Sequence, residues 1–204
     1  MKKWVSMMFL LALFVLPMSA YADSASSEDN LTLDEIKAHY EWIFNKYQVN
    51  EPFSAEDADF VMKHGKDVGA VFVNKKDDEP HILASGKKSF QGSKDNYAIT
   101  GYVNYDMATI GKNTWDVYIS AWDIAGIKRD ITASFGIDCF GVIDVSTGAV
   151  GKIYSTTLSQ STQSKASYLD MSKSAGYTGW VISAYYYPKA TFDNTTEVTG
   201  TFLN

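Results

Sequence analysis

Hydrophobic and polar residues alternate strictly in two adjoining stretches near the middle of the chain, 115–122 and 130–137. The apolar positions are Trp115, Val117, Ile119 and Ala121 in the first stretch and Ile131, Ala133, Phe135 and Ile137 in the second. Successive side chains of a β-strand point to opposite faces, so this period of two is typical of a strand with one buried face. The pattern predicts two neighbouring, half-buried strands.

The segment between these strands predicts how they pair. If Asp123 faces Arg129 across a loop centred on Gly126, every apolar residue of both strands falls on one face, whereas a shift of one residue separates the two apolar rows. This register predicts a hairpin in which Val117 lies opposite Phe135. A glycine in the middle of the loop departs from the usual three-residue hairpin. A longer loop, or two strands that belong to different sheets, therefore stays an alternative.

The N-terminal part of the chain has helical spacing. Thr32 and Glu35 stand where a capping box requires them, and apolar residues then recur every three or four positions up to Tyr47. The pattern predicts a helix over 33–48. Ser54 starts a second, shorter helix that ends near Gly65, so residues 31–65 are expected to form an α-helical hairpin. Ala58, Val61 and Met62 are the residues expected to face the first helix; they lie within that hairpin.

The remainder of the chain has the character of short strands separated by turns. We expect a small β-hairpin from 68–73 and 81–84 around a charged turn at 75–80, and a loop or linker over 85–96. Further strands are expected at 97–107, 150–158, 168–171, 177–187 and 191–203. The predicted fold is mainly β, an antiparallel β-sandwich or barrel preceded by the helical hairpin. The domain boundary is expected between 31–95 and 96–204.

The first residues have the features of a signal peptide. Lys2 and Lys3 precede an apolar run over 7–16, and Ala20-Tyr21-Ala22 matches a cleavage site. The run is too short to span a bilayer. We expect residues 1–22 to be a signal peptide cleaved after Ala22 and residues 23–30 to be a flexible leader. The mature protein is therefore expected to be secreted, soluble and without a stable membrane anchor.

Charge and cysteine content narrow the choice of partners. The chain has 18 basic and 24 acidic residues, and removal of Lys2 and Lys3 leaves 16 basic residues and a net charge of −8. An acidic protein is a poor ligand for nucleic acid, so no nucleic-acid partner is expected. Cys139 is the only cysteine, so an intramolecular disulfide is impossible. We interpret Cys139 as a small buried hydrophobe, with a bond between chains as the alternative.

Motifs of catalysis and cofactor binding are missing from the sequence. His39, His64 and His81 have no partner at metal-ligand spacing, and there is no nucleophile elbow or glycine-rich phosphate loop. No catalytic residue, metal site or cofactor is therefore assigned, and the sequence does not indicate an oligomeric state.

The candidate binding surface is the polar face of the predicted sheet. It carries Tyr102, Tyr118 and Trp122 beside Asp116 and Asp130, and in the predicted register Trp122 stands opposite Asp130. Exposed aromatic rings beside carboxylates suit the faces of sugars and also suit a protein partner. The alternative is that the helical hairpin packs on this face and buries all three rings.

These observations favour an exported, non-enzymatic binding protein whose partner is an extracellular glycan or a protein. The alternative is an extracellular carbohydrate-active hydrolase that uses aspartates paired on the same face, namely Asp106, Asp116 and Asp130. A third hypothesis is a β-pore-forming protein, because residues 146–174 are rich in Ser and Thr and alternate in character.

Overall fold

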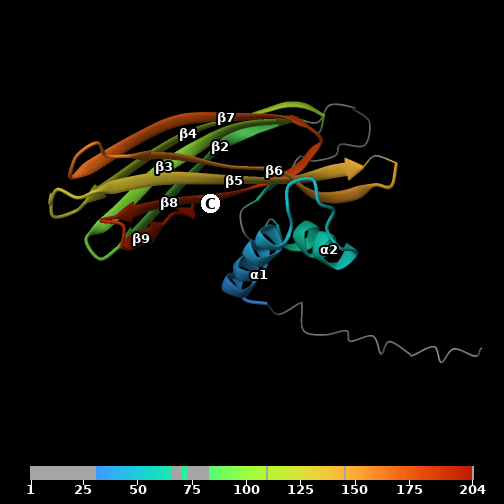
Figure 1. Cartoon of the computed structure of the whole chain (residues 1–204), viewed down its shortest axis with the longest axis horizontal. Helices are drawn as coiled ribbons and strands as arrows, with labels where there is room; N and C mark the ends of the chain where they lie inside the picture. Colours follow the sequence, from blue (N-terminus) through green and yellow to red (C-terminus); the bar gives the residue numbers. More distant parts are fainter. Residues whose placement is uncertain (1–30, 66–69, 73–82, 109, 145, 204) are drawn as a thin grey trace, which may run out of the picture. The chain divides into compact units, whose positions relative to one another are not determined.

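The computed structural model describes residues 31–65, 70–72, 83–108, 110–144 and 146–203, which are mainly β (Figure 1). The helices are α1 (Leu33–Lys46) and α2 (Ala55–His64). The strands are β1 (Val71–Phe72), β2 (Leu83–Lys94), β3 (Tyr97–Ala108), β4 (Gly111–Asp123), β5 (Ile131–Asp144), β6 (Ala149–Ser161), β7 (Tyr168–Gly179), β8 (Val181–Phe192), β9 (Thr196–Thr199) and β10 (Thr201–Phe202). The predicted signal peptide and leader lie outside the described residues.

The strands form two antiparallel sheets that pack face to face (Figure 1). Sheet A has the order β1-β8-β5-β6, with β9 paired to β8, and sheet B has the order β10-β2-β3-β4-β7. In the part of the chain that the structure describes, the sheets stay open and do not close into a barrel. The predicted antiparallel sandwich with two N-terminal helices is confirmed.

The core lies between the two sheets and is built from the inward rows that the alternation predicted. Val117 of β4 is 2% exposed and Phe135 of β5 is fully buried. Trp115 of sheet B donates a hydrogen bond from Nε1 to the hydroxyl of Tyr186 in sheet A at 2.9 Å. Burial raises the pKa of Tyr186 well above its ordinary value, so this hydroxyl stays neutral. Cys139 belongs to the same core and is fully buried, as we interpreted it.

The hairpin predicted between the two central strands is wrong. β4 pairs with β3 and β7 in sheet B, whereas β5 pairs with β6 and β8 in sheet A. Val117 and Phe135 therefore face one core from two different sheets. Counting alternate positions cannot distinguish this arrangement from a hairpin, because both place the two apolar rows against the same core.

The loop between β4 and β5 links the two sheets, and part of its predicted structure is confirmed. Arg129 Nε lies 3.1 Å from Asp123 Oδ2, so the predicted ion pair is present. Arg129 also contacts Asp193 at 3.0 Å, in the turn after β8. Gly126 has a φ of 72°, a conformation that favours glycine. The loop therefore carries the chain from one sheet to the other, and its ion pairs fix this end of the sandwich.

The two helices begin and end close to the predicted residues. The reciprocal capping box of Thr32 and Glu35 is present at the start of α1, and Ser54 caps α2. Val61 is buried as predicted, but Met62 is 48% exposed. Phe60 is buried instead and stacks on the ring of His39 at 4.0 Å. The contact between the helices therefore depends on an aromatic side chain that the predicted face left out.

The loop expected over 85–96 is also wrong, because β2 pairs with β3 along its whole length. Its apolar signal is weak: of the inward positions, Phe90 is fully buried, but Gly92 has no side chain to bury. A Cβ at Gly92 would lie 2.2 Å from the backbone oxygen of Thr199, so the close approach of the C-terminal segment requires glycine. The small β-hairpin predicted from 68–73 and 81–84 is not formed by the described residues. The short strand β1 pairs with β8, whereas β2 begins at Leu83 and pairs with β3. The charged turn predicted at 75–80 lies outside the described residues.

Both helices lie on the outer side of sheet A (Figure 1). The ring of Tyr185, which points outward from β8, stacks on Phe44 at 6.1 Å and contacts Tyr40 at 5.2 Å between ring centroids. The segment that joins the helices is held to β6 by backbone hydrogen bonds, including one from Phe53 to Val150 at 2.8 Å. The helices therefore cover one end of sheet A and leave the outer face of sheet B to other contacts.

Candidate functional site

The three predicted aromatic residues lie together on the outer face of sheet B. Tyr102 of β3 is directly opposite Tyr118 of β4, and Trp122 follows Tyr118 by four residues on the same face. Each of the three is partly exposed. The alternative in which the helical hairpin buries them is wrong, because the helices pack on sheet A (Figure 1).

The outward side chains of β2, β3, β4 and β7 include four neighbouring cross-strand rows, which we call the sheet B face. The rows are Lys87–Asn104–Asp116–Ser174, Ser89–Tyr102–Tyr118–Ser172, Gln91–Thr100–Ser120–Asp170 and Ser93–Ala98–Trp122–Tyr168. Apart from the aromatic residues and one alanine, every member carries a hydroxyl, amide or charged group. The face therefore combines aromatic rings with a dense set of hydrogen-bonding groups.

A continuous chain of contacts holds part of this face in place. The Nζ atom of Lys87 lies 3.8 Å from the ring centroid of Tyr102, and that ring stacks on Tyr118 at 5.6 Å. The Tyr118 hydroxyl donates to Oδ1 of Asp170 at 3.0 Å. This hydrogen bond is the main reason that the pKa of Tyr118 is raised. The faces of the two tyrosine rings contact Lys87 and each other. We therefore assign Tyr102 and Tyr118 a structural role in this surface and not a role in stacking on a ligand.

Tyr168 is the aromatic residue that the sequence reasoning missed. It is 63% exposed and lies beside Trp122 in the last row of the sheet B face. The alternation of Tyr168 with the buried Leu169 and Met171 indicated that it points outward. Its position next to Trp122 depends on the pairing of β4 with β7, which the sequence pattern does not specify.

Only two of the three predicted carboxylates, Asp106 and Asp116, share a face. Asp116 lies on the sheet B face and accepts a hydrogen bond from the Ser174 hydroxyl at 2.5 Å, with Asp106 as a diagonal neighbour on the same face. Asp130 lies in the loop before β5, where its backbone N–H donates to Asp193 at 3.1 Å. Asp116 is seven positions from the loop end of β4, which corresponds to about 23 Å along a strand. The predicted pairing of Asp116 and Trp122 with Asp130 is wrong, because both residues are paired across sheet B with β3 and β7.

The Ser- and Thr-rich stretch over 146–174 contributes to two different sheets. β6 is an edge strand of sheet A and β7 is an edge strand of sheet B. β6 pairs with the preceding strand β5, whereas β7 pairs with the distant strand β4, so β6 and β7 are not paired with each other. In the described structure, the stretch is part of the sandwich and does not form a paired hairpin.

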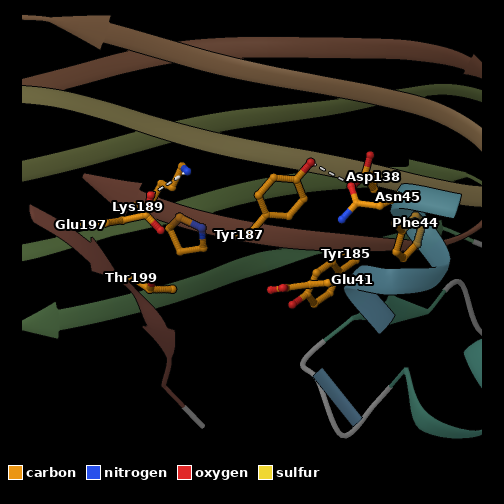
Figure 2. A pocket seen from close by; sticks show the side chains of 10 residues that line it. Glu41, Phe44, Asn45, Asp138, Tyr185, Tyr187, Lys189, Glu197 and Thr199 are labelled. Carbon is orange, nitrogen blue, oxygen red and sulfur yellow. Dashed lines mark hydrogen bonds and ion pairs between the residues drawn. The ribbon is translucent and has the colours of Figure 1, made fainter. Parts of the chain in front are cut away.

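A pocket of about 330 Å³ lies on the outer side of sheet A, between α1 and strands β5, β8 and β9 (Figure 2). It is lined by Glu41, Phe44, Asn45, Asp138, Tyr185, Tyr187, Pro188, Lys189, Glu197 and Thr199. We call it the sheet A pocket. None of these residues belongs to the predicted site.

Tyr187 and Asp138 form the inner part of this pocket. A Cβ at Gly136 would lie 1.7 Å from the Tyr187 ring, so the ring lies directly over this glycine. From there the Tyr187 hydroxyl donates to Oδ2 of Asp138 at 2.8 Å (Figure 2). Burial and the Asp138 charge raise the pKa of Tyr187. Asp138 is only 6% exposed, and its other oxygen, Oδ1, has no hydrogen-bond partner within the described part of the chain.

Acidic groups outnumber basic groups around the pocket. Glu41, Asp138 and Glu197 line it, whereas Lys189 is the single basic residue in its lining. Lys189 Nζ is paired with Glu197 at 2.8 Å (Figure 2). Burial, followed by the charges of Glu41 and Asp138, raises the pKa of Tyr185 to about 12. Glu41 and Asp138, which have no basic partner among the described lining residues, therefore act on the same aromatic wall.

Other kinds of site receive no support from the described residues. Over the described ranges, no three His, Cys, Asp or Glu side chains are grouped as metal ligands would be. Neither α1 nor α2 has the length and apolar character needed to cross a membrane. Comparison with protein-family models, with curated proteins and with solved structures finds no match to this chain. Any functional assignment therefore depends on the two surfaces described above.

Proposed function

We propose that the protein is an exported, non-enzymatic binding protein and that its sheet B face binds an extracellular glycan. Export is proposed from the charged start, apolar run and cleavage pattern of residues 1–22. The binding role is proposed from the composition and geometry of the sheet B face.

The observation that carries the proposal is the pair of neighbouring rows at one end of this face. Trp122 and Tyr168 stand side by side, and the next row places Ser120 beside Asp170. An aromatic ring packs against the C–H groups of a sugar, while adjacent carboxylates and hydroxyls bond its hydroxyl groups. Trp122 and Tyr168 thus supply the stacking surface, and Ser120 and Asp170 supply the polar contacts.

The polar character of the face favours a glycan over a protein partner. The centres of protein–protein interfaces are depleted in charged residues and in serine. The rows of the sheet B face contain serine, threonine and amide side chains between the rings, with Ala98 as the one aliphatic member. A hydrated polymer with many hydroxyl groups matches this distribution of donors and acceptors.

Binding is favoured over hydrolysis because Asp130, one of the three aspartates predicted to act together, lies apart from Asp116. Asp116 is on the sheet B face, whereas Asp130 is bonded to the turn that contains Asp193. Glycosidases hold their two carboxyl groups within about 10 Å of each other. The hydrolase hypothesis thereby loses its geometric basis for this pair of residues.

The test is retention of mature protein on insoluble peptidoglycan, chitin and cellulose, together with a glycan array. We expect wild-type protein to bind at least one of these glycans and the double variant Trp122→Ala/Tyr168→Ala to lose that binding. Trp42→Ala is the matched control, because Trp42 is 53% exposed on α1, away from the sheet B face. Unchanged binding by the double variant, or no retained glycan for the wild type, would contradict the proposal.

A further inference from the structure

The sheet A pocket contains an unusual buried group. Asp138 is 6% exposed, and its Oδ2 atom accepts from Tyr187 at 2.8 Å. Its Oδ1 atom is buried and has no donor among the residues that the structure describes. A buried carboxylate oxygen without a donor is costly, and most such oxygens in folded proteins have a partner. A hydrogen-bond donor would satisfy this oxygen, and a cationic donor would also offset the desolvation of the carboxylate.

The walls of the pocket have the chemistry that accommodates a cation. Phe44 and Tyr185 stack with an interplanar angle of 7°, and the Tyr185 and Tyr187 ring centroids are 5.9 Å apart. Aromatic faces attract ammonium groups through the ring quadrupole. Glu41 adds a second carboxylate at the α1 side of the pocket (Figure 2). Rings and acids thus surround the same space.

Among the described residues that line the pocket, acidic groups outnumber basic ones. Lys189 is the one basic residue in the lining, and its Nζ is 2.8 Å from Glu197. This pairing leaves Glu41 and Asp138 without a basic partner in the pocket lining. An incoming cation would meet the buried Asp138, where electrostatic attraction is less screened than at the surface, and the exposed Glu41 beside it.

We propose that the sheet A pocket binds a primary alkylammonium group, with Asp138 as its principal partner. The ammonium N–H groups supply the donor that Oδ1 lacks, and the alkyl part packs against Phe44, Tyr185 and Tyr187. The terminal torsion of an aspartate is broad, and its rotation moves both oxygens together, so Oδ1 reaches the pocket as Oδ2 moves away from the Tyr187 hydroxyl. The pocket volume of about 330 Å³ is at the lower end of the range for small-molecule sites, which suits a short amine. This site is independent of the sheet B face.

The test is titration of the mature protein with n-butylammonium, followed by NMR chemical shifts and calorimetry. We expect saturable binding that shifts the resonances of Tyr185 and Tyr187. 1-Butanol should bind at least about tenfold more weakly, since it has the same alkyl chain without the charge. Tetramethylammonium should also bind more weakly, because it is a cation without N–H donors.

Asp138→Asn keeps the shape of the side chain and removes its charge, so n-butylammonium binding should weaken about tenfold or more. Asp116→Asn is the matched control, because it makes the same charge change on the sheet B face and should leave the affinity unchanged. A thermal melt of each variant verifies that the protein is folded. Absence of saturable n-butylammonium binding to the wild type, equal binding by folded Asp138→Asn, or equal binding of 1-butanol would overturn the proposal.

Discussion

The outer faces of the two sheets both carry tyrosines but differ in what covers them. On sheet A, Tyr185 is 7% exposed because α1 packs on it. On sheet B, Tyr168 is 63% exposed at the end of an aromatic row. Both tyrosines occupy outward positions of their strands. The difference shows that alternation determines which side chains point outward, whereas packing of other elements determines which of them stay accessible.

The choice of sheet follows from the apolar stripe of α1. Tyr40, Ile43 and Phe44 are at most 4% exposed, so this helix needs a large apolar surface opposite it. Sheet A provides Tyr185 and the fully buried Phe140, which lies outside the core between the sheets. The rows of the sheet B face are mainly polar and would leave the stripe without apolar contacts. Packing on sheet A therefore buries more apolar area.

The largest effect is expected at the contact between α1 and sheet A. Phe44→Ala should lower the free energy of unfolding by about 3–5 kcal/mol, because it empties a buried aromatic site. Trp42→Ala, on the exposed side of the same helix, should cost less than about 1 kcal/mol. Urea denaturation of both variants measures the difference. Equal losses of unfolding free energy in the two variants would mean that Phe44 is not buried between α1 and sheet A.

The next effect concerns the glycine beneath Tyr187. Gly136→Ala should lower the free energy of unfolding by about 1–3 kcal/mol, because the new Cβ collides with the Tyr187 ring and displaces it from Asp138. Gly176→Ala on β7 is the control, because the nearest atom to its new Cβ would be the backbone oxygen of Asn113, at 3.4 Å. That variant should be neutral or slightly more stable. A neutral Gly136→Ala would show that Tyr187 does not lie over this position.

The attachment of the two helices to each other should depend on pH through Asp57. Burial alone would raise the pKa of Asp57, but hydrogen bonds from Lys46, Tyr47 and Ser54 hold it below its ordinary value. A carboxylate with a lowered pKa in the folded state stabilises the protein above its unfolded pKa of about 4, and this contribution is lost as the pH falls further.

Thermal melts between neutral pH and about pH 2 test this dependence. The melting temperature of the wild type should fall below about pH 4. Asp57→Asn should melt at a lower temperature at neutral pH and should show a shallower acid dependence. Asp116→Asn on the sheet B face makes the same charge change and should retain the wild-type slope. If the melting temperature of Asp57→Asn depended on pH as steeply as that of the wild type, Asp57 would not be the cause of the acid dependence.

The smallest effects are expected from single hydroxyl groups, which compare a buried tyrosine with an exposed one. Tyr40→Phe removes a buried hydrogen bond to the Val61 carbonyl at 3.2 Å and should cost about 1 kcal/mol. Tyr118→Phe removes an exposed hydrogen bond to Asp170 and should cost less than about 0.5 kcal/mol. Paired urea titrations resolve these values. A larger loss for Tyr118→Phe than for Tyr40→Phe would reverse the assignment of covered and open faces.

Local patterns in the sequence predicted the helices and the inward rows, because caps and alternation depend on neighbouring residues. The capping box at Thr32 and Glu35 and the buried row around Phe135 are of this kind. The partner of each strand could not be predicted in the same way. Hairpin and sandwich arrangements both give Val117 and Phe135 a common core, and only long-range packing distinguishes them.

The same limit explains the outcome for the two sites. Tyr102 and Tyr118 were predicted to share a face, and outward positions on sequential strands are sufficient for that inference. The sheet A pocket was missed because it depends on contacts between distant segments. The Tyr187–Asp138 hydrogen bond, for example, joins β8 to β5 across 49 residues. Nothing near Asp138 in the sequence indicates that its partner is a tyrosine.

The most direct test of this account is hydroxyl-radical footprinting of the mature protein, free and bound to the glycan that retains it most strongly. In the free protein we expect Trp122 and Tyr168 to be oxidised much faster than Tyr40 and Tyr185. In the bound protein we expect Trp122 and Tyr168 to be protected while Trp42 on α1 stays reactive. Rapid oxidation of Tyr40 and Tyr185 in the free protein, or protection of Trp42 without protection of Trp122 and Tyr168, would contradict an open binding face on sheet B.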